Sequence, residues 1–191
     1  YASDKQDAGN LYKVLRNAFG PYDVLSVVDA GDRDTQAEII SAFEIDPESW
    51  ILVGSIDAEE GLNLQFAHAI CHMDLPTSVS RLEQRIGRLD RFGRRIPKIQ
   101  HRIVLPSDDE DAPWYVWLDF LLTGYKIFNG SVSDVQFKLA DLEREVWGRL
   151  FEEGSACSEE LLQYIEETIS DERQKLNEQH ALDDLANLNE S

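Results

Sequence analysis

The sequence predicts an α/β fold, with a parallel sheet flanked by helices, followed by an α-helical extension. Over residues 1–105, short apolar runs alternate with amphipathic segments. Beyond this point apolar residues recur at helical spacing and acidic residues dominate, so the net charge of −19 divides into −4 for residues 1–105 and −15 for residues 106–191. We therefore expect two parts, an α/β domain over residues 1–106 and an acidic α-helical extension over residues 107–191.

Four short apolar runs predict the strands of the sheet. They are Val24–Val28, Trp50–Gly54, Ala69–Met73 and Arg102–Leu105. Continuous apolar runs of this length are typical of parallel strands that are buried on both faces. Ligands of such sheets bind beyond the carboxyl ends of the strands, so the residues that follow each run are the first candidates for a site.

Three amphipathic segments predict the helices between these strands. Asp4–Phe19 and Asp34–Phe43 carry apolar residues three and four positions apart, and a start signal precedes each: Ser3-Asp4 for the first, Asp32 or Asp34 for the second. The third helix follows the run that ends at Met73, with Thr77 or Ser78 as its cap. Its apolar stripe consists of Val79, Leu82, Ile86 and Leu89.

The third helix also carries regularly spaced arginines. The spacing predicts that Arg81, Arg85 and Arg88 lie on a different face from the apolar stripe. Gln84, Arg85, Arg88 and Arg91 would then form a cationic cluster at the carboxyl edge of the sheet. The fixed fork of the guanidinium suits bidentate contact with phosphate. The alternative is an exposed basic helix that pairs with acidic neighbours such as Glu83 and Asp90.

The extension contains three predicted helices, over residues 112–128, 131–151 and from Ser158 to about residue 188. Because phosphate binding needs Lys and Arg, its charge of −15 argues against a module that grips DNA. Two interpretations stay open. One is a solvated acidic face; the other is a docking surface for a basic protein, or a gate that repels nucleic acid.

Other features set limits on the class of protein. Cys71 and Cys157 share no motif, which predicts reduced thiols in a cytosolic protein, and no Cys/His cluster has metal-ligand spacing. No apolar run is long enough to predict a membrane span, and no signal peptide is visible. The chain opens with YASDKQ, from which we expect a piece of a longer protein.

Two strings resemble the conserved motifs of superfamily 2 helicases and translocases. SIDAEEGLNLQ (55–65) is similar to motif V, and EQRIGRLDRFGR (83–94) is similar to motif VI, of the second RecA-like lobe. The first residues, YAS, resemble the end of the strand that bears motif IV. Within the superfamily, the amino-acid sequence of these motifs is similar to that of the Swi/Snf-type group, of the RapA-like bacterial ATPases that act on RNA polymerase, and of related phage-defence helicases.

The resemblance implies roles at the ATP site for residues of motifs V and VI. Arg88 and Arg91 would reach the γ-phosphate of ATP, with Arg91 as the arginine finger. Gln84 and Arg85 would order the interface with the first lobe. Gly61 and Asn63 match the end of motif V, which contacts the nucleotide, although many relatives have Asp where Asn63 stands.

The resemblance also implies contacts with nucleic acid. Ser55 matches a hydroxyl of motif V that touches the nucleic-acid backbone, and Ser3 would do the same from motif IV. Contacts of this kind follow the phosphates and carry no sequence information.

The motifs of the first lobe are missing from the sequence. There is no GxxxxGK[ST] string and no DExx-type acidic box after a strand. The resemblance therefore implies that ATP and the ligands of Mg²⁺ belong to a first lobe of the same parent chain, and that residues 1–191 alone hydrolyse no ATP. It implies translocation on double-stranded DNA more than strand separation. The rival hypothesis is a non-catalytic RecA-like scaffold whose acidic helices bind a protein partner.

Overall fold

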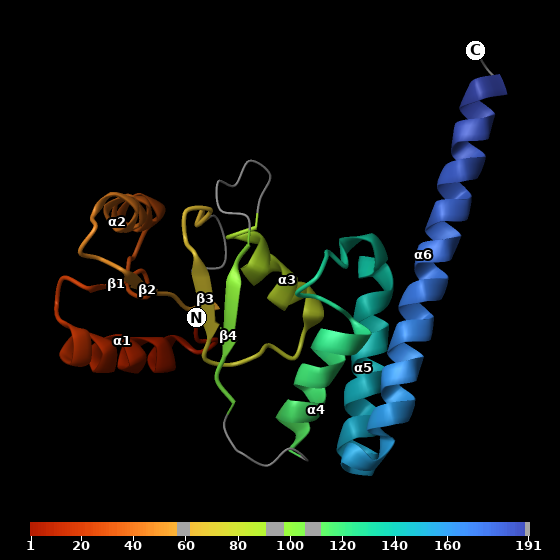
Figure 1. The fold of residues 1–191 in the computed structure, drawn as a ribbon, viewed down its shortest axis with the longest axis horizontal. Coiled ribbons are helices and arrows are strands. Elements are labelled where there is room, and N and C mark those ends of the chain that lie inside the picture. Colours follow the sequence, from red (N-terminus) through yellow and green to blue (C-terminus); the bar gives the residue numbers. More distant parts are fainter. Residues whose placement is uncertain (57–61, 91–97, 106–111, 190–191) are drawn as a thin grey trace. The chain divides into compact units, whose positions relative to one another are not determined.

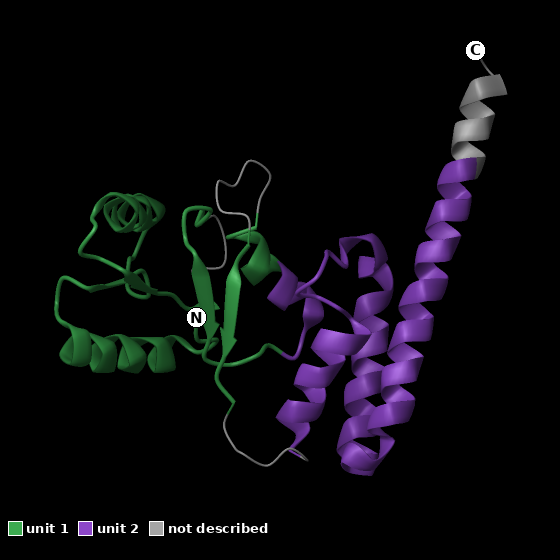
Figure 2. Ribbon diagram, viewed as in Figure 1, with its two compact units in different colours: residues 1–76, 84–105 green, residues 77–83, 106–191 purple. Residues whose placement is uncertain are grey.

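The computed structural model describes residues 1–56, 62–90, 98–105 and 112–189, with side chains described as far as residue 181. The chain divides into two compact units (Figure 2). Unit 1 comprises residues 1–76 and 84–105, and unit 2 comprises residues 77–83 and 106–191. The predicted fold class is confirmed, because parallel strands and helices are followed by an all-helical stretch that ends in a long helix. No helix in the described part of the chain is both long enough and apolar enough to cross a membrane.

The strands of unit 1 form two parallel pairs. β1 (Val24–Ser26) pairs with β2 (Ile51–Val53), and β3 (Ala69–His72) pairs with β4 (Gln100–Ile103). Each strand overlaps one of the four predicted apolar runs, which confirms the strand predictions. The observed strands are short, and β4 begins two residues before the run that predicted it.

The first residues of the chain join the two pairs of strands. The backbone nitrogen of Tyr1 donates to the carbonyl of Cys71 (2.8 Å), and Met73 N donates to the carbonyl of Tyr1 (2.8 Å). This alternation between Cys71 and Met73 is the pattern of a parallel ladder. On the other side, Ala2 N donates to the carbonyl of Gly54 (3.2 Å), just after β2.

Two helices of unit 1 begin at acidic caps. α1 (Lys5–Phe19) begins after Asp4, whose carboxylate accepts from Gln6 N and Asp7 N. α2 (Arg33–Ile45) begins after Asp32, whose carboxylate accepts from Thr35 N. These carboxylates satisfy amides that have no partner within the helix. Asp4 is thereby confirmed as a start signal, and of the two candidates for α2 the structure selects Asp32.

α1 and α2 cover opposite faces of the β1–β2 pair (Figure 1). They pack against two separate groups of buried side chains. The α1 side contains Ala2, Ala8, Val24, Val28 and Val53. The α2 side contains Val27, Leu62, Leu64, Ile70 and Leu89. The second group matters for function, because it unites residues from the segments that resemble motifs V and VI.

α3 (Val79–Gly87) is the helix that carries the arginines. All four residues of the predicted apolar stripe are buried: Val79, Leu82, Ile86 and Leu89. The helix is shared between the two units, with residues up to Glu83 in unit 2 and residues from Gln84 in unit 1.

Unit 2 begins, beyond its share of α3, with a helix that changes type. α4 (Pro113–Asp119) continues into a π-helical turn, η2 (Phe120–Gly124), in which Tyr125 N donates to the carbonyl of Phe120. The predicted single helix over residues 112–128 was therefore wrong in its second half. Close packing of η2 against α6 gives one physical reason for a glycine here: a Cβ on Gly124 would lie 3.0 Å from a methyl of Ile165.

The last two helices of unit 2 run side by side with α4 (Figure 1). α5 (Gln136–Glu153) follows a 3₁₀ turn, η3 (Ser133–Val135), and ends at Gly154, which has φ +71°. A second 3₁₀ turn, η4 (Gly154–Cys157), leads into α6 (Ser158–Asn189), so the long final helix is confirmed. Both helices bury apolar residues at helical spacing: Leu139, Leu142, Val146, Leu150, Leu161, Ile165 and Ile169. Leu162, which was expected in the stripe of α6, is only partly buried.

Candidate functional site

A polar cluster lies at the carboxyl ends of the strands of unit 1. Arg85, on α3, is its centre, and its side chain has an exposure of 0%. One guanidinium nitrogen donates to the carbonyl of Asp74 (3.1 Å), and the other donates to the hydroxyl of Ser3 (3.1 Å). The aromatic ring of Tyr1 lies 5.2 Å from the guanidinium carbon, within the range of a cation–π contact.

Asp74 completes this cluster. Its carboxylate accepts from the backbone nitrogen of Ser3 (2.6 Å) and from the Ser3 hydroxyl, and it lies 3.7 Å from Arg85. A buried guanidinium is stable only when its charge and its donors are matched. Asp74 and Ser3 provide that match, so the cluster fixes α3 to the ends of two strand segments.

The prediction that Arg85 lies on a polar face away from the apolar stripe was wrong. Arg85 follows Leu82 by three residues and precedes Leu89 by four, and both leucines are buried. On a helix these spacings make neighbours, so Arg85 is drawn into the interior with them. Its contact with nucleotide or with a first lobe stays a prediction.

The segments that resemble motifs V and VI are joined by a backbone hydrogen bond. Leu64 N donates to the carbonyl of Arg88 at 3.0 Å, directly beyond the end of α3. Leu62, Leu64 and Leu89 share the same apolar group. Two strings that lie about twenty residues apart in the sequence are thus held together at one end of α3.

Arg88 differs from Arg85 in its surroundings. It is partly buried, and its Nε is inaccessible to solvent without a hydrogen-bond partner among the described residues. A buried donor without a partner costs free energy, which is a common feature of sites that await a ligand. Arg88 is therefore the predicted site residue whose chemistry best fits an anion.

The other residues predicted at the ATP site have mixed placements. Gln84 and Asn63 are exposed, and the Asn63 side chain accepts from Gln65 N at 3.4 Å. Asn63 also borders a hollow of about 360 Å³ that includes Arg33, Gln36 and Glu44 of α2. Arg91 and Gly61 lie outside the described residues, so their predicted roles stay predictions.

The two serines predicted to touch nucleic acid are both at strand ends. Ser3 is partly buried and bound to Asp74 and Arg85. Ser55, two residues beyond β2, has an exposure of 0%, and its hydroxyl has no hydrogen-bond partner among the described residues. Ser55 therefore has an unused hydroxyl, whereas the hydroxyl of Ser3 is occupied within the fold.

Two stacked histidines lie near Arg85. The rings of His72 and His101 are 5.6 Å apart with an interplanar angle of 8°, and His72 Nε2 lies 3.3 Å from His101 Nδ1. The pKa of His72 is lowered to about 3, chiefly by burial and in addition by the positive charges of Arg85, His101 and the amino group of Tyr1. His72 is therefore neutral at physiological pH, which avoids a second buried cation beside Arg85.

Sequence reasoning missed the central role of Asp74. A polar residue directly after a buried strand is a signal that was available, because it places a carboxylate at the edge where sites form. Its partner Arg85 could be identified only from the structure.

A magnesium site does not fit the described residues. Among them, no group of three or more His, Cys, Asp or Glu side chains is arranged to hold a metal ion. Phosphate-bound Mg²⁺ needs oxygen ligands, chiefly carboxylates.

Comparison with known proteins gives a family match over the first half of the chain. Residues 2–93 match the model of the helicase conserved C-terminal domain. The RNA polymerase-associated protein RapA of Pseudomonas aeruginosa (strain LESB58) is 44% identical over 137 residues, covering 68% of this chain and 14% of the relative. RapA of Pseudomonas putida (strain F1) is 36% identical over 94 residues, covering 48% of this chain and 10% of the relative. The chain thus spans between a tenth and a seventh of the length of these relatives.

A solved structure gives an independent likeness of fold. The C-terminal part of the Fun30 ATPase domain matches with a TM-score of 0.50 and 15% identity, covering 87% of this chain and 47% of that one. Residues 2–93 carry the family match, and the two strings that resemble motifs V and VI fall within or at the end of this range. The chain therefore contains the C-terminal, RecA-like lobe of a superfamily 2 helicase, similar to that of RapA.

Proposed function

We propose that this lobe belongs to an ATP-dependent translocase that moves along double-stranded DNA. A first lobe would hold ATP and Mg²⁺, and this lobe would close on the nucleotide to complete the catalytic site. Hydrolysis would reopen the lobes, and alternating grip on the DNA backbone would produce stepping. The observation that carries the proposal is Arg88, directly beyond the end of α3, whose buried Nε has no hydrogen-bond partner among the described residues.

Arg88 and Arg91 would act on the phosphates. As phosphoryl transfer proceeds, negative charge accumulates on the oxygens of the transferred group and of the leaving group. Guanidinium donors fixed in advance stabilise that charge without the cost of reorganising during the reaction. Arg91 would serve as the finger, and Arg88 would contact the γ-phosphate beside it.

The contact between the two motif segments supports this assignment. Because Leu64 N binds the carbonyl of Arg88, any movement of α3 also moves the segment that contains Asn63. Gly61 and Asn63 would contact the nucleotide, and exposed Gln84 would contribute hydrogen bonds at the same interface. Arg85 would order this interface from the interior, through its bonds to Ser3 and Asp74.

Nucleic acid would contact the lobe through hydroxyls at strand ends. Ser55 would contact a backbone phosphate from beyond the end of β2, because its hydroxyl has no hydrogen-bond partner among the residues that the structure describes. Ser3 would contribute by turning its hydroxyl proton, which Asp74 accepts in this structure, toward a phosphate oxygen. Contacts with backbone phosphates do not depend on the base sequence, so they would let a translocase bind DNA of any sequence.

ATPase activity of the longer polypeptide, measured with DNA present, tests the proposal. Arg88→Ala should lower kcat by about 10³-fold, the order expected for a residue that stabilises the transferring phosphoryl group. Arg144→Ala is the matched control, because Arg144 lies on the exposed side of α5 with a side chain that is 77% exposed. Residues 1–191 alone should show no turnover. Equal activity of the Arg88 and Arg144 variants, or turnover by the isolated chain, would overturn the proposal.

A second candidate is a non-catalytic scaffold, in which the acidic helices bind a basic protein. One observation favours it: between residues 170 and 181, α6 presents no fully buried side chain. The RapA relatives are named as RNA polymerase-associated, so an RNA polymerase is the first partner to test. Binding to RNA polymerase that survives in an Arg88→Ala variant devoid of ATPase activity would support this additional role. Full ATPase activity with the last helix removed would leave the first proposal intact and separate the two.

A further inference from the structure

The N-terminal end of α3 is capped by a carboxylate from another helix of unit 2. Glu143, on α5, accepts a hydrogen bond from Val79 N at 2.7 Å. The amide of Ser80 and the hydroxyl of Ser78 also donate to this carboxylate. The cap thus comes from a residue 64 positions along the chain from Val79.

Two more contacts hold the same half of α3. The indole nitrogen of Trp147, one turn after Glu143, donates to the carbonyl of Thr77 at 2.9 Å. The carboxylate of Glu83 accepts from Val132 N at 3.0 Å and from the Ser131 hydroxyl. Unit 2 therefore binds α3 before its first turn, at its first turn and at its middle.

The environment of Glu143 indicates that this cap is specific. Burial raises its pKa, and hydrogen bonds from Val79, Ser78 and Ser80 oppose the rise. A partly buried carboxylate is costly unless donors compensate it, and the amides at a helix N-terminus provide both donors and a favourable dipole. These hydrogen bonds therefore satisfy both partners. The partly buried carboxylate of Glu143 gains donors, and the amides of the first turn, which have no acceptor within the helix, gain an acceptor.

The same helix carries the arginines. Arg85 lies six residues beyond Val79, about 9 Å along the helix axis. Between them the backbone is continuously helical, so a displacement at the first turn is transmitted to Arg85 and to Arg88 just beyond it. In unit 1, Arg85 is fixed to Ser3 and Asp74, so α3 is held at both ends by different sets of residues.

We propose that Glu143 is a positioning residue for the arginines of the ATP site, so that the acidic helical unit sets the catalytic competence of the lobe. The inference rests on the proposed function, since it assigns a role to the helix that presents Arg85 and Arg88. This role of the acidic α-helical extension does not require a partner protein.

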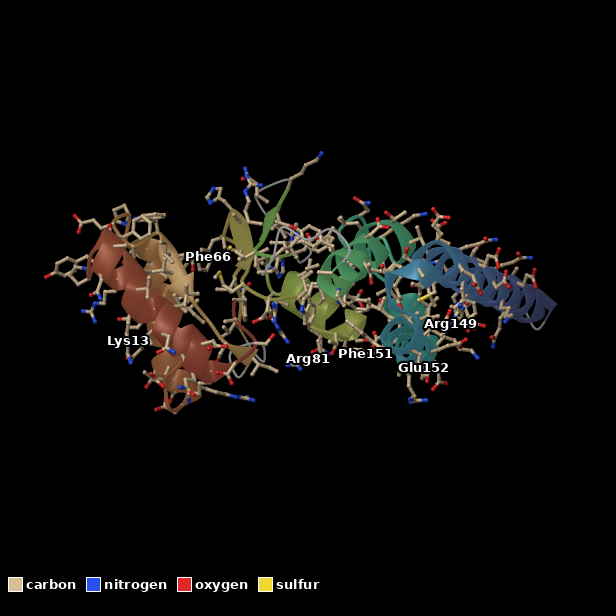
Figure 3. All side chains as sticks on the ribbon, turned by 90° about the horizontal axis from the view of Figure 1, so that it is seen from below. Lys13, Phe66, Arg81, Arg149, Phe151 and Glu152 are labelled. Atoms are coloured by element: carbon tan, nitrogen blue, oxygen red, sulfur yellow. The ribbon has the colours of Figure 1, made fainter. Side chains whose placement is uncertain are left out.

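Hydrogen exchange on residues 1–191 tests the structural half of the inference. Glu143→Ala should reduce the protection of the α3 amides roughly tenfold, the size expected when a helix cap is lost. Glu152→Ala is the matched control, because Glu152 lies on the same helix and is exposed (Figure 3). Unchanged protection in Glu143→Ala, or an equal loss in Glu152→Ala, would overturn the inference.

Steady-state kinetics of the longer polypeptide test the functional half. At a temperature where the variants are folded by circular dichroism, Glu143→Ala should lower kcat about tenfold, with the KM for ATP changed less than twofold. Glu143→Gln keeps an oxygen acceptor and should recover most of the loss. If Glu143→Ala does not fold, Glu143→Gln carries the test, with an expected twofold to fivefold fall in kcat that Glu152→Gln does not show.

The two proposals fail in different ways. If Arg88→Ala abolishes turnover while both Glu143 variants keep the wild-type kcat, the positioning role is wrong and the ATP site stands. If Arg88→Ala is fully active, the ATP site itself is wrong. In that case a loss of α3 protection would show a cap without a catalytic consequence, which also rejects the positioning role.

Discussion

The two units differ in how many polar side chains they bury. Among the described residues, four polar or charged side chains are classed as buried, and all of them lie in unit 1: Ser49, Ser55, His72 and Arg85. Unit 2 buries an almost wholly apolar interior, which includes Trp117, Phe120 and Leu121. The polar groups of unit 2 that most resemble the buried polar side chains of unit 1 are the half-buried carboxylate of Glu143, which caps α3, and the hydroxyl of Tyr125.

This difference separates a part of the chain built for a site from a part built for packing. Buried polar groups contribute little net stability and lose much if a partner is removed, so they persist where geometry matters. An apolar interior stabilises through area and close packing instead. Apart from Glu143, which caps α3, substitutions in unit 2 are expected to act on stability alone, while substitutions in unit 1 act on stability and catalysis together.

The largest effect on stability is expected in unit 2. Trp117 has an exposure of 0% and contacts the rings of Tyr125 and Trp147 at centroid distances of 5.9 and 4.8 Å. Trp117→Ala should lower the free energy of unfolding by about 3–5 kcal/mol. Urea denaturation measures the loss, and hydrogen exchange should locate it in residues 112–181. Trp114→Ala, on the same helix but 39% exposed, should cost about 1 kcal/mol; an equal loss would contradict the view that burial decides the effect.

A smaller effect is expected at the polar cluster of unit 1. Arg85→Ala removes the partner of Asp74 and Ser3 and leaves a cavity in the interior, so it should lower the free energy of unfolding by about 3 kcal/mol. Arg144→Ala should change it by less than about 0.5 kcal/mol, because that side chain is exposed. Chemical denaturation of both variants provides the comparison. A stable Arg85→Ala variant would show that the cluster is dispensable for folding.

The smallest effect concerns the pH dependence of unit 1. The pKa of His72 is lowered to about 3, so between about pH 6.5 and 3 the unfolded chain binds a proton that the folded chain excludes. Above pH 6.5, His72 is neutral in both states and does not lower the free energy of unfolding. As the pH falls through this window, the free energy of unfolding decreases by roughly 1.4 kcal/mol per pH unit, because the proton binds the unfolded chain and not the folded one. Unfolding measured from pH 7 to pH 5 should show a shallower slope in His72→Gln than in the wild type. His68→Gln, at an exposed histidine, should keep the wild-type slope.

Local signals predicted most of the secondary structure. Asp4 and Asp32 were available as caps because a cap bonds to amides two or three residues away, and this spacing is written in the sequence. The apolar stripe of α3 was confirmed residue by residue, since helical periodicity is also local. The π turn after Asp119 was not predicted, because it depends on how closely α6 approaches Gly124.

The candidate site was predicted less completely. The motif strings drew attention to Arg85 and Arg88 together, but only the structure distinguishes them. Arg85 is enclosed by Ser3 and Asp74, which lie 82 and 11 residues away, whereas no described residue accepts a hydrogen bond from Arg88 Nε. The difference in hydrogen bonding between the two arginines depends on which strand ends lie beside α3. The helical periodicity of 3.6 residues contains no information about these neighbours.

By itself, the sequence determined the alternation of strands and helices, the helix cap at Asp4, the choice of Asp32 or Asp34 as the second cap, and the resemblance of residues 55–65 and 83–94 to helicase motifs. These follow from local spacing and from residue type. Only the tertiary structure decided that Arg85 is a buried anchor, that Leu64 is bonded to Arg88, and that Glu143 caps the arginine helix. The reason is physical: partners for buried charges and helix ends are selected by proximity in space, and the topology that creates this proximity emerges only when the whole chain is packed.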